Sequence, residues 1–319
     1  MSALKLQIEH ELKKFNATNN SIESLFIGGG TPSTVSPELY LPIFELLSPY
    51  MSKEAEITSE ANPNSATKEW LEGMFKLGVN RISFGVQSFN NEKLKLLNRA
   101  HTSKQATNAI LTAKKVGYKN LSLDLIYATL GDTKELLLYD IERAFELPIN
   151  HISAYALTIE EGTAFESKPQ MSSEELSLTK WVFQEINRRG FKQYEISNFG
   201  TYNSKHNLGY WYYKDYIGAG SGAVGKLNNR RYYPDINIET YIKNPLNIRV
   251  ETLEEEDQIL EKIFLGFRSN IGVPRKLLST KEFTQATLLV NEKKLHFKND
   301  TFYNKDFLLA DEIALFLTS

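Results

Sequence analysis

Polar residues close a series of short apolar runs in this sequence. They are Gly28-Gly29-Gly30-Thr31, Glu60, Gln87, Asp124 and Tyr155, each at the end of a run with strand character. In parallel α/β sheets and barrels, the carboxyl ends of strands form the rim where ligands bind, because they bring side chains from distant parts of the chain to one mouth. A single polar residue at a strand end is usually a helix cap or a surface residue. A series over consecutive strands predicts a shared pocket.

The glycine segment Gly28-Gly29-Gly30-Thr31-Pro32 follows the apolar run Leu25-Phe26-Ile27. Glycine lacks a Cβ atom and adopts positive φ, so the backbone is able to approach a ligand closely. The segment is not a phosphate loop, because no Gly-Lys-Ser/Thr follows and the spacing does not match Gly-x-Gly-x-x-Gly. Taken alone, it fits a strand-to-helix turn as well as a cofactor site.

Four other residues offer hydrogen bonds or charge to a ligand. Glu60 is able to accept hydrogen bonds from an amine or from ribose hydroxyls, and Gln87 offers both donors and an acceptor. Arg99 and His101 follow the next short helix and are candidates for binding a carboxylate. The alternative for this pair is a solvated helix end.

A histidine among large aromatic residues forms a second candidate site. It lies in His206-Asn207-Leu208-Gly209-Tyr210-Trp211, which is followed by Tyr212, Tyr213 and Tyr216. Histidine ligates haem iron, and aromatic faces pack on the macrocycle. A lone histidine is more often a hydrogen-bonded structural residue, so the residues alone leave both interpretations open. His10, His151 and His296 show no ligand spacing and are expected to be structural.

Short β-prone runs alternate with helical patterns over the first half of the chain. Strands are predicted at 24–27, 56–59, 81–86, 121–127 and 151–157, and helices near 37–49, 67–77, 103–116 and 133–145. This repetition indicates βαβ units and a parallel sheet, either barrel-like or doubly wound. Leu4, Ile8, Leu12 and Phe15 predict an amphipathic helix before the first strand.

The second half is less regular. A long helix is predicted at 172–189, and the aromatic-rich stretch 194–233 does not divide clearly into elements. Thr252-Leu253-Glu254-Glu255 predicts a capping box, so the acidic run 254–257 is interpreted as a helix N-terminus rather than an acidic binding site. The tail 273–319 predicts a small α+β region.

Composition limits the classes of function. The 319 residues are 41% hydrophobic and 24% charged with a net charge of -2, which lacks the basic excess of a nucleic-acid binder and favours a small-molecule ligand. No apolar stretch approaches the roughly 20 residues of a membrane span, and the first residues have no signal-peptide character, so a cytoplasmic location is expected. The sequence has no cysteine, which excludes disulfides, thiolate zinc sites and cysteine-ligated iron–sulfur clusters within it.

Several strings together resemble the oxygen-independent coproporphyrinogen III oxidase family of radical S-adenosylmethionine (SAM) proteins, and more closely its haem chaperone branch. The matching stretches are 26–33, 60–63, 78–89, 124–127 and 206–211, in one order along nearly the whole chain. The resemblance implies an α/β fold with a partial (β/α)6 TIM-like barrel, missing its first strand, over residues 1–230. A small C-terminal helical or α+β domain is expected over residues 231–319.

The resemblance also implies roles for individual residues. By that resemblance Gly29, Gly30 and Thr31 would contact the methionyl end of SAM, and Glu60, Gln87, Arg99 and Asp124 would complete the pocket. The residues that match the haem-associated motif of the chaperone branch are His206, Asn207, Tyr210 and Trp211. In that motif His206 is the candidate ligand of haem iron.

One feature of the family is missing from this sequence. The family carries Cys-x-x-x-Cys-x-x-Cys in the loop after its first strand, where three thiolates hold a [4Fe–4S] cluster. The five predicted strands are one fewer than the family's six, so we expect the first strand and the cluster loop to be missing together, which makes 24–27 an edge strand. A truncated chain, a late start codon in the gene model and natural loss would look alike, and the intact pocket residues favour truncation. The sequence as written is predicted to perform no radical chemistry.

Two functions remain open at this point. The first is a haem-binding chaperone that delivers haem to a partner protein, with SAM and the [4Fe–4S] cluster belonging to the full-length form. The second is an oxidase acting on coproporphyrinogen III. The His206 motif favours the first, and a barrel enzyme unrelated to tetrapyrroles would need the matching strings to be coincidence. The expected partners are haem or a porphyrin and a haem-receiving protein, with no nucleic acid and no transmembrane segment.

Overall fold

The computed structural model describes residues 1–159, 165–173 and 175–319. The chain divides into two compact units. We call Ser24–Leu39 with Glu56–Asn203 the barrel unit, and Met1–Glu23 with Tyr40–Ala55 and Ser204–Ser319 the second unit. The domain boundary near residue 230 stays a prediction.

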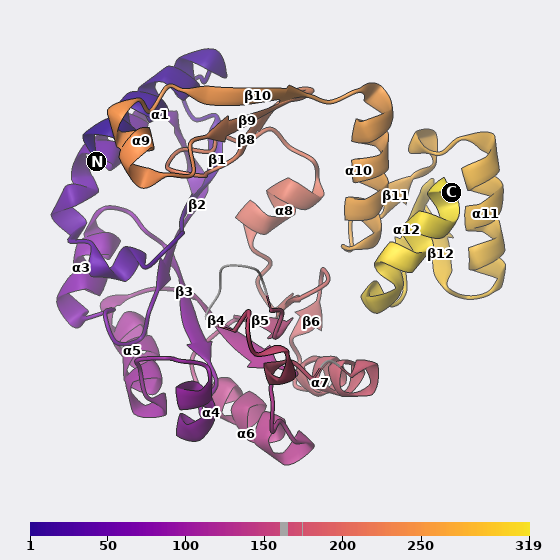
Figure 1. The fold of residues 1–319 in the computed structure, drawn as a ribbon, viewed down its shortest axis with the longest axis horizontal. Coiled ribbons are helices and arrows are strands. Elements are labelled where there is room, and N and C mark those ends of the chain that lie inside the picture. Colours follow the sequence, from indigo (N-terminus) through magenta and orange to yellow (C-terminus); the bar gives the residue numbers. More distant parts are fainter. Residues whose placement is uncertain (160–164, 174) are drawn as a thin grey trace. The chain divides into compact units, whose positions relative to one another are not determined.

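A seven-stranded sheet organises the barrel unit (Figure 1). Its strand order is β1 (Ile22–Ile27), β2 (Met51–Ala61), β3 (Arg81–Gln87), β4 (Asn120–Tyr127), β5 (His151–Ala156), β7 (Asn198–Gly200) and β6 (Lys192–Gln193). Strands β2 to β5 pair in parallel, and β7 pairs antiparallel with both β5 and β6. The five predicted strands and the parallel sheet are confirmed, and β1 lies at one end of the order as expected. The sheet curls into a half-barrel, so the barrel-like alternative is the observed one.

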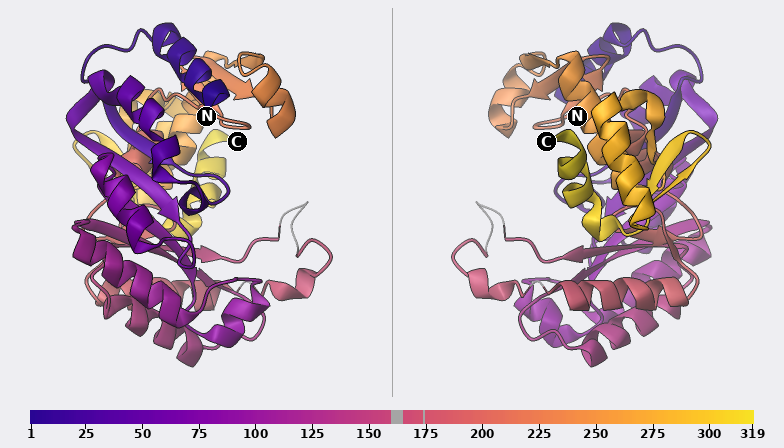
Figure 2. Two further views of the ribbon diagram at one scale, coloured as in Figure 1. Left: turned by 90° about the vertical axis from the view of Figure 1, so that its left-hand side faces the viewer. Right: turned by 90° about the vertical axis from the view of Figure 1, so that its right-hand side faces the viewer.

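Helices cover one face of this sheet (Figure 2). They are α3 (Lys68–Lys76), α4 (Asn91–Leu96), α5 (Ser103–Val116), α6 (Lys134–Phe145) and α7 (Leu176–Arg188). Side chains of the central strands such as Ile82, Phe84 and Leu121 are fully buried, which explains the nearly continuous apolar runs. The helix predicted to start at residue 172 begins at Leu176, because Ser172 still pairs with Thr129 and its hydroxyl donates to the Leu157 carbonyl.

The first part of the second unit joins distant segments of sequence. It contains α1 (Ser2–Lys14), α2 (Leu41–Leu47), α8 (Lys205–Trp211), α9 (Ile238–Lys243) and a three-stranded antiparallel sheet, β10 (Ile248–Thr252), β9 (Arg230–Pro234) and β8 (Gly225–Leu227). The helix predicted near 37–49 is broken into a 3-10 turn at Pro37–Leu39, helix α2 and a further 3-10 turn at Ser48–Tyr50. Proline is tolerated in the first turn of a helix but not in its interior, and each piece carries one near its start.

The last part of the chain forms the small α+β region predicted from the tail. Helices α10 (Glu255–Phe267), α11 (Thr280–Asn291) and α12 (Ala310–Thr318) accompany a sheet of β11 (Val273–Pro274), β13 (Thr301–Asn304) and β12 (Leu295–Lys298). Phe267, Leu295 and Phe302 are buried in its core. The capping box predicted at Thr252 is wrong by two residues, because Thr252 still belongs to β10 and Glu254 caps α10 with Asp257.

Within the described ranges, no helix combines the length and the apolar character that crossing a bilayer requires.

Candidate functional site

The glycine segment after β1 brings backbone close to a carboxylate. Gly29 and Gly30 have φ of 77° and 61°, a backbone conformation that residues with a side chain rarely adopt. A Cβ atom on Gly28 would lie 3.2 Å from the Glu60 carboxyl carbon and 2.5 Å from a ring carbon of Phe26. The Gly29 backbone also lies near the Glu60 carboxylate and lowers its pKa. The missing side chains therefore allow this backbone to lie against Glu60, at the end of β2.

Glu60 belongs to a group of charged side chains with Asp124 of β4 and Arg99, which follows α4. Burial raises the pKa of Glu60, and the nearby Gly29 backbone opposes this rise. Burial also raises the pKa of Asp124 to about 6; the hydrogen bond with Ser153 lowers it, and the nearby Glu60 charge raises it. Partial desolvation lowers the pKa of Arg99, and the Asp124 charge counteracts this effect. The two carboxylates and the guanidinium thus lie close enough to influence one another's protonation.

Asp124 of this group and Tyr155 lie on neighbouring strands. Asp124 was predicted at a strand end but lies in the middle of β4, where it pairs in register with Ser153 of β5. Tyr155 follows on β5, where the side chain as a whole is exposed, and desolvation of its hydroxyl together with the Asp124 charge raises the pKa of that hydroxyl. Residues of β2, β4 and β5 therefore lie near one another at this edge of the sheet, and the pocket expected there stays a prediction.

Gln87 ends β3 in a backbone conformation unusual for a residue with a side chain. Its φ is 69°, and the pairing with β4 shifts register between Phe84 and Gln87. A Cβ atom on Gly85 would lie 3.2 Å from the Gln87 amide nitrogen and 3.9 Å from the Asn62 amide oxygen. Both amides therefore lie over Gly85, where no side chain competes for the space. Strained backbone of this kind is frequent at ligand sites.

Two remaining candidates, Thr31 and His101, have polar groups that contact the protein's own backbone. The Thr31 carbonyl accepts hydrogen bonds from the N–H and the hydroxyl of Thr34, which closes a turn. His101 is buried, and its Nε2 lies 2.9 Å from the Val86 carbonyl oxygen, so it is not part of a solvated helix end. The assignment of individual residues to SAM stays a prediction.

Sequence reasoning missed Glu195 in the barrel unit. Glu195 is only 1% exposed, and burial raises its pKa to about 7 although the polar groups of Ser197 and Asn198 lower it. The charge of Glu195 also helps to raise the pKa of Tyr155. The residue comes from the stretch that showed no clear elements, so no periodicity pointed to it.

His151 is structural, as predicted. Its Nδ1 lies 2.7 Å from the Ser122 hydroxyl and its Nε2 lies 2.8 Å from the Tyr194 hydroxyl. Burial, with the nearby Arg81 charge, holds the pKa of His151 well below its usual range. The neutral imidazole therefore cross-links β4, β5 and the segment before β7.

The His206 motif forms helix α8 in the second unit. Ser204 caps this helix by accepting a hydrogen bond from the Asn207 N–H. His206 and Tyr210 lie one turn apart, with ring centroids 4.9 Å apart in an edge-to-face arrangement, and Tyr216 packs on Tyr210 in the same way at 4.7 Å. His206 is half-buried and Tyr210 is exposed. One side of α8 thus carries an imidazole beside two aromatic rings.

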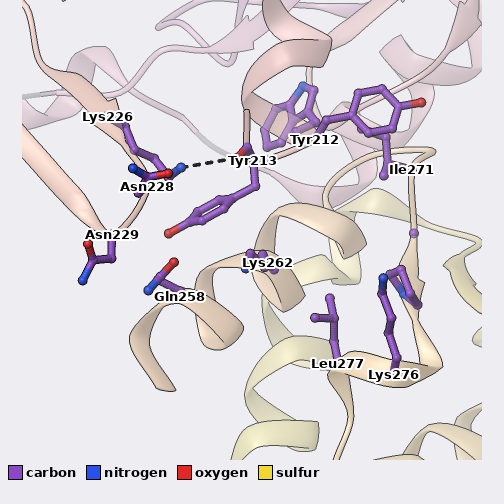
Figure 3. Close-up of a pocket in the computed structure, with 13 residues that line it drawn as sticks. Tyr212, Tyr213, Lys226, Asn228, Asn229, Gln258, Lys262, Ile271, Lys276 and Leu277 are labelled. Atoms are coloured by element: carbon purple, nitrogen blue, oxygen red, sulfur yellow. Dashed lines mark hydrogen bonds between the residues drawn. The ribbon is translucent and has the colours of Figure 1, made fainter. Parts of the chain in front are cut away.

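Trp211, the last residue of α8, lines a cavity of about 650 Å³ (Figure 3). Tyr212 and Tyr213 line it as well, together with residues of β8, α10 and the segment around β11. Over the part of the chain that the structure describes, the buried Nε1 of Trp211 has no hydrogen-bond partner. All residues of this cavity belong to the second unit.

No group of three or more His, Cys, Asp or Glu side chains among the described residues is arranged to hold a metal ion. The sequence offers no thiolate. The residues present therefore do not fit a cysteine-ligated iron–sulfur cluster.

Comparisons with known proteins agree with this fold and these motifs. The family model described as the Radical SAM superfamily matches residues 4–144. The coproporphyrinogen III oxidase HemN of Escherichia coli superposes with a TM-score of 0.82 over 100% of this chain and 82% of that one, at 18% identity, which shows a shared fold. The fold class is that of a radical SAM protein with a TIM-like half-barrel.

Closer similarity exists to curated proteins. The heme chaperone HemW of Lactococcus lactis is 33% identical over 96% of this chain and 87% of its own length. The HemW of Haemophilus influenzae is 36% identical over 85% of this chain and 74% of its own length. This chain belongs to the HemW family. The resemblance found in the sequence is confirmed.

Proposed function

We propose that this chain binds haem and passes it to a haem-receiving protein. The observation that supports this most is the geometry of α8, where His206 stands 4.9 Å from the ring of Tyr210 and Tyr216 extends the aromatic surface. A half-buried imidazole beside aromatic faces suits axial ligation of haem iron and packing on the macrocycle. Asn207 and Trp211 complete the motif on the same helix.

The names of the relatives favour this function over oxidase activity. Several relatives at 32–37% identity are called heme chaperones. The likeness to the oxidase HemN, at 18% identity, is one of fold. Haem or a porphyrin is therefore the proposed cargo, and the cytoplasmic location expected from the sequence stays a prediction.

We also propose that the rim of the barrel unit binds SAM. Glu60 and Asp124 present carboxylates to a positively charged amine or to ribose hydroxyls, Arg99 presents a cation to a carboxylate, and Gln87 offers an amide. Gly29, Gly30 and Thr31 leave room for close approach of the methionyl end. In family members that carry the cysteine motif, a [4Fe–4S] cluster would supply the electron for radical chemistry. This sequence has no thiolate to hold such a cluster.

A haem titration of the purified chain tests the proposed function. We expect a saturable shift of the Soret absorption band with one haem bound per chain, and transfer of that haem to a haem-free globin. His206→Ala should lose the ligand-dependent Soret shift and bind haem at least about tenfold more weakly. The matched control is His296→Ala, because His296 also lies 4.9 Å from a tyrosine ring, that of Tyr303, outside the motif.

Two results would contradict the proposal. One is a wild-type chain that shows no saturable haem binding. The other is a His206→Ala variant with the same spectrum and affinity as His296→Ala.

A further inference from the structure

The cavity at the end of α8 has a mixed aromatic and cationic wall (Figure 3). Its volume of about 650 Å³ lies within the range of roughly 300–1,000 Å³ that small-molecule sites occupy. Trp211 ends α8 and Tyr213 lies just after it. The three lysines are Lys226 of β8, Lys262 of α10 and Lys276 of the 3-10 turn Arg275–Leu277. Of the lining residues that the structure describes, none is acidic.

Two of the lysines share one aromatic ring. The Nζ atoms of Lys226 and Lys262 lie 4.1 Å and 5.0 Å from the ring centroid of Tyr213. Cations are attracted to the face of such a ring, but two ammonium groups around one ring repel each other. An anion in the cavity would relieve this repulsion.

Two acidic residues that interact with Lys226 or with Tyr213 already have partners. Asp215 pairs with Lys226 at 3.0 Å, and Glu261 accepts hydrogen bonds from the Tyr213 hydroxyl and from Arg231. Between residues 1 and 319, leaving aside 160–164 and 174, no ion pair involves Lys262 or Lys276. These two ammonium groups are therefore positioned to bind carboxylates supplied by a ligand.

The rest of the wall suits a flat apolar body with a polar edge. Trp211 and Tyr212 contribute aromatic surface, and Ile271, Pro274 and Leu277 contribute aliphatic surface. The unpaired Nε1 of Trp211 is a buried donor, and leaving such a group without a partner costs free energy that a ligand oxygen would recover. Lys262 directly precedes Ile263, and Lys276 directly precedes Leu277. Both apolar residues pack in the C-terminal core, which fixes the backbone at the two lysines.

We propose that this cavity binds the carboxylate-bearing edge of a porphyrin, with Lys262 and Lys276 contacting its two propionates and Trp211 and Tyr213 its ring. This inference rests on the proposed function and assigns residues that determine which tetrapyrroles the chain accepts. A porphyrin whose carboxylates are esterified loses these two contacts and binds weakly.

The test compares two ligands and three proteins. Iron(III) protoporphyrin IX and its dimethyl ester are titrated into the wild-type chain, into Lys262→Gln/Lys276→Gln, and into Lys293→Gln/Lys298→Gln. The last variant removes the same charge from exposed lysines of the C-terminal region and is the matched control. We expect the Lys262/Lys276 double variant to bind the diacid about tenfold more weakly than the control binds it. We also expect the dimethyl ester to bind all three proteins with one weak affinity.

The outcomes separate this inference from the proposed function. If the wild type binds the diacid and His206→Ala weakens that binding, but the Lys262/Lys276 variant matches its control, the cavity assignment is overturned and the haem-binding function stands. Equal affinity of the wild type for diacid and ester would overturn the cavity assignment as well. A wild-type chain that binds neither ligand overturns both proposals. Thermal unfolding of each variant shows whether it is folded.

Discussion

The carboxylate of Asp140 on α6 accepts hydrogen bonds from the hydroxyl of Ser88, with oxygen–oxygen distances of 2.7 and 2.9 Å. The same carboxylate accepts the N–H of Phe89 at 2.6 Å, and the ammonium of Lys93 lies 3.9 Å away. All of these groups are buried. Because Ser88 directly follows Gln87, this cluster fixes the strand end that carries one of the rim residues.

Removing the Asp140 carboxylate should destabilise the barrel unit. Asp140→Ala leaves a buried hydroxyl, a buried N–H and a buried ammonium with fewer partners, which we expect to lower the free energy of unfolding by about 2–4 kcal/mol in urea titrations. Asp311→Ala is the control, since Asp311 forms an exposed pair with Arg268 and should cost less than about 1 kcal/mol. Equal losses in the two variants would show that the buried cluster contributes little.

Glu195 predicts a pH dependence of stability. Its pKa is raised to about 7 in the folded chain, from an ordinary value of 4.5. Between these values the unfolded chain releases the proton that the folded chain keeps, so the contribution of Glu195 to stability is intact below pH 4.5 and is lost as the pH rises through 7. In the Glu195→Gln variant the side-chain amide cannot ionise. We expect its stability relative to wild type to rise from pH 4.5 to pH 8 by on the order of 2–3 kcal/mol.

This prediction is checked by urea unfolding of both proteins at several pH values. The control is Glu72→Gln, because Glu72 is a partly exposed residue on α3 that pairs with Lys68. Comparing variants removes the effects of other titrating groups, such as His151. Parallel stability curves for wild type and Glu195→Gln would be incompatible with a raised pKa at Glu195.

The regular elements of the barrel unit could be predicted because local signals agree with the tertiary structure. Helix α5 has the predicted bounds Ser103–Val116, since Thr102 and Gln105 form a capping box and Gly117 ends the helix. The fully buried positions of β3 and β4 make strands recognisable as apolar runs. The rim position of Glu60 follows from these strands and from the parallel connection between them.

Other parts of the site depend on pairings that the sequence does not display. Glu195 lies between β6 and β7, which have two and three residues and are too short for a strand period. Its position near Tyr155 results from the antiparallel pairing of β7 with β5. The cavity beside Trp211 likewise joins residues more than sixty positions apart, so composition and spacing gave no sign of it.

We expect no iron–sulfur absorption from this chain after anaerobic reconstitution with iron and sulfide. A [4Fe–4S] cluster needs thiolate ligands, and the sequence has none. Colorimetric iron and sulfide assays on the desalted protein measure this directly. A stoichiometric brown species would show that other side chains hold a cluster.

Affinity for SAM should be weak and should depend on Glu60. Without a cluster to chelate the methionyl group, only the contacts at the rim of the barrel unit remain. Glu60→Ala removes the carboxylate that lies beside the Gly29 backbone and influences Asp124, so we expect binding measured by calorimetry to weaken roughly tenfold further. Glu92→Ala, on the exposed side of α4, is the control and should bind SAM as the wild type does.

The position of the Glu60 carboxylate can be tested separately from its charge. Gly28→Ala keeps Glu60, but its Cβ atom would lie 3.2 Å from the Glu60 carboxyl carbon and 2.5 Å from the Phe26 ring, so one of these side chains must move. If the close approach of backbone to Glu60 positions the carboxylate for SAM, Gly28→Ala should weaken SAM binding about as much as Glu60→Ala, and the double variant should be no worse than either single one. Tight SAM binding that neither substitution changes would place the SAM site elsewhere in the chain.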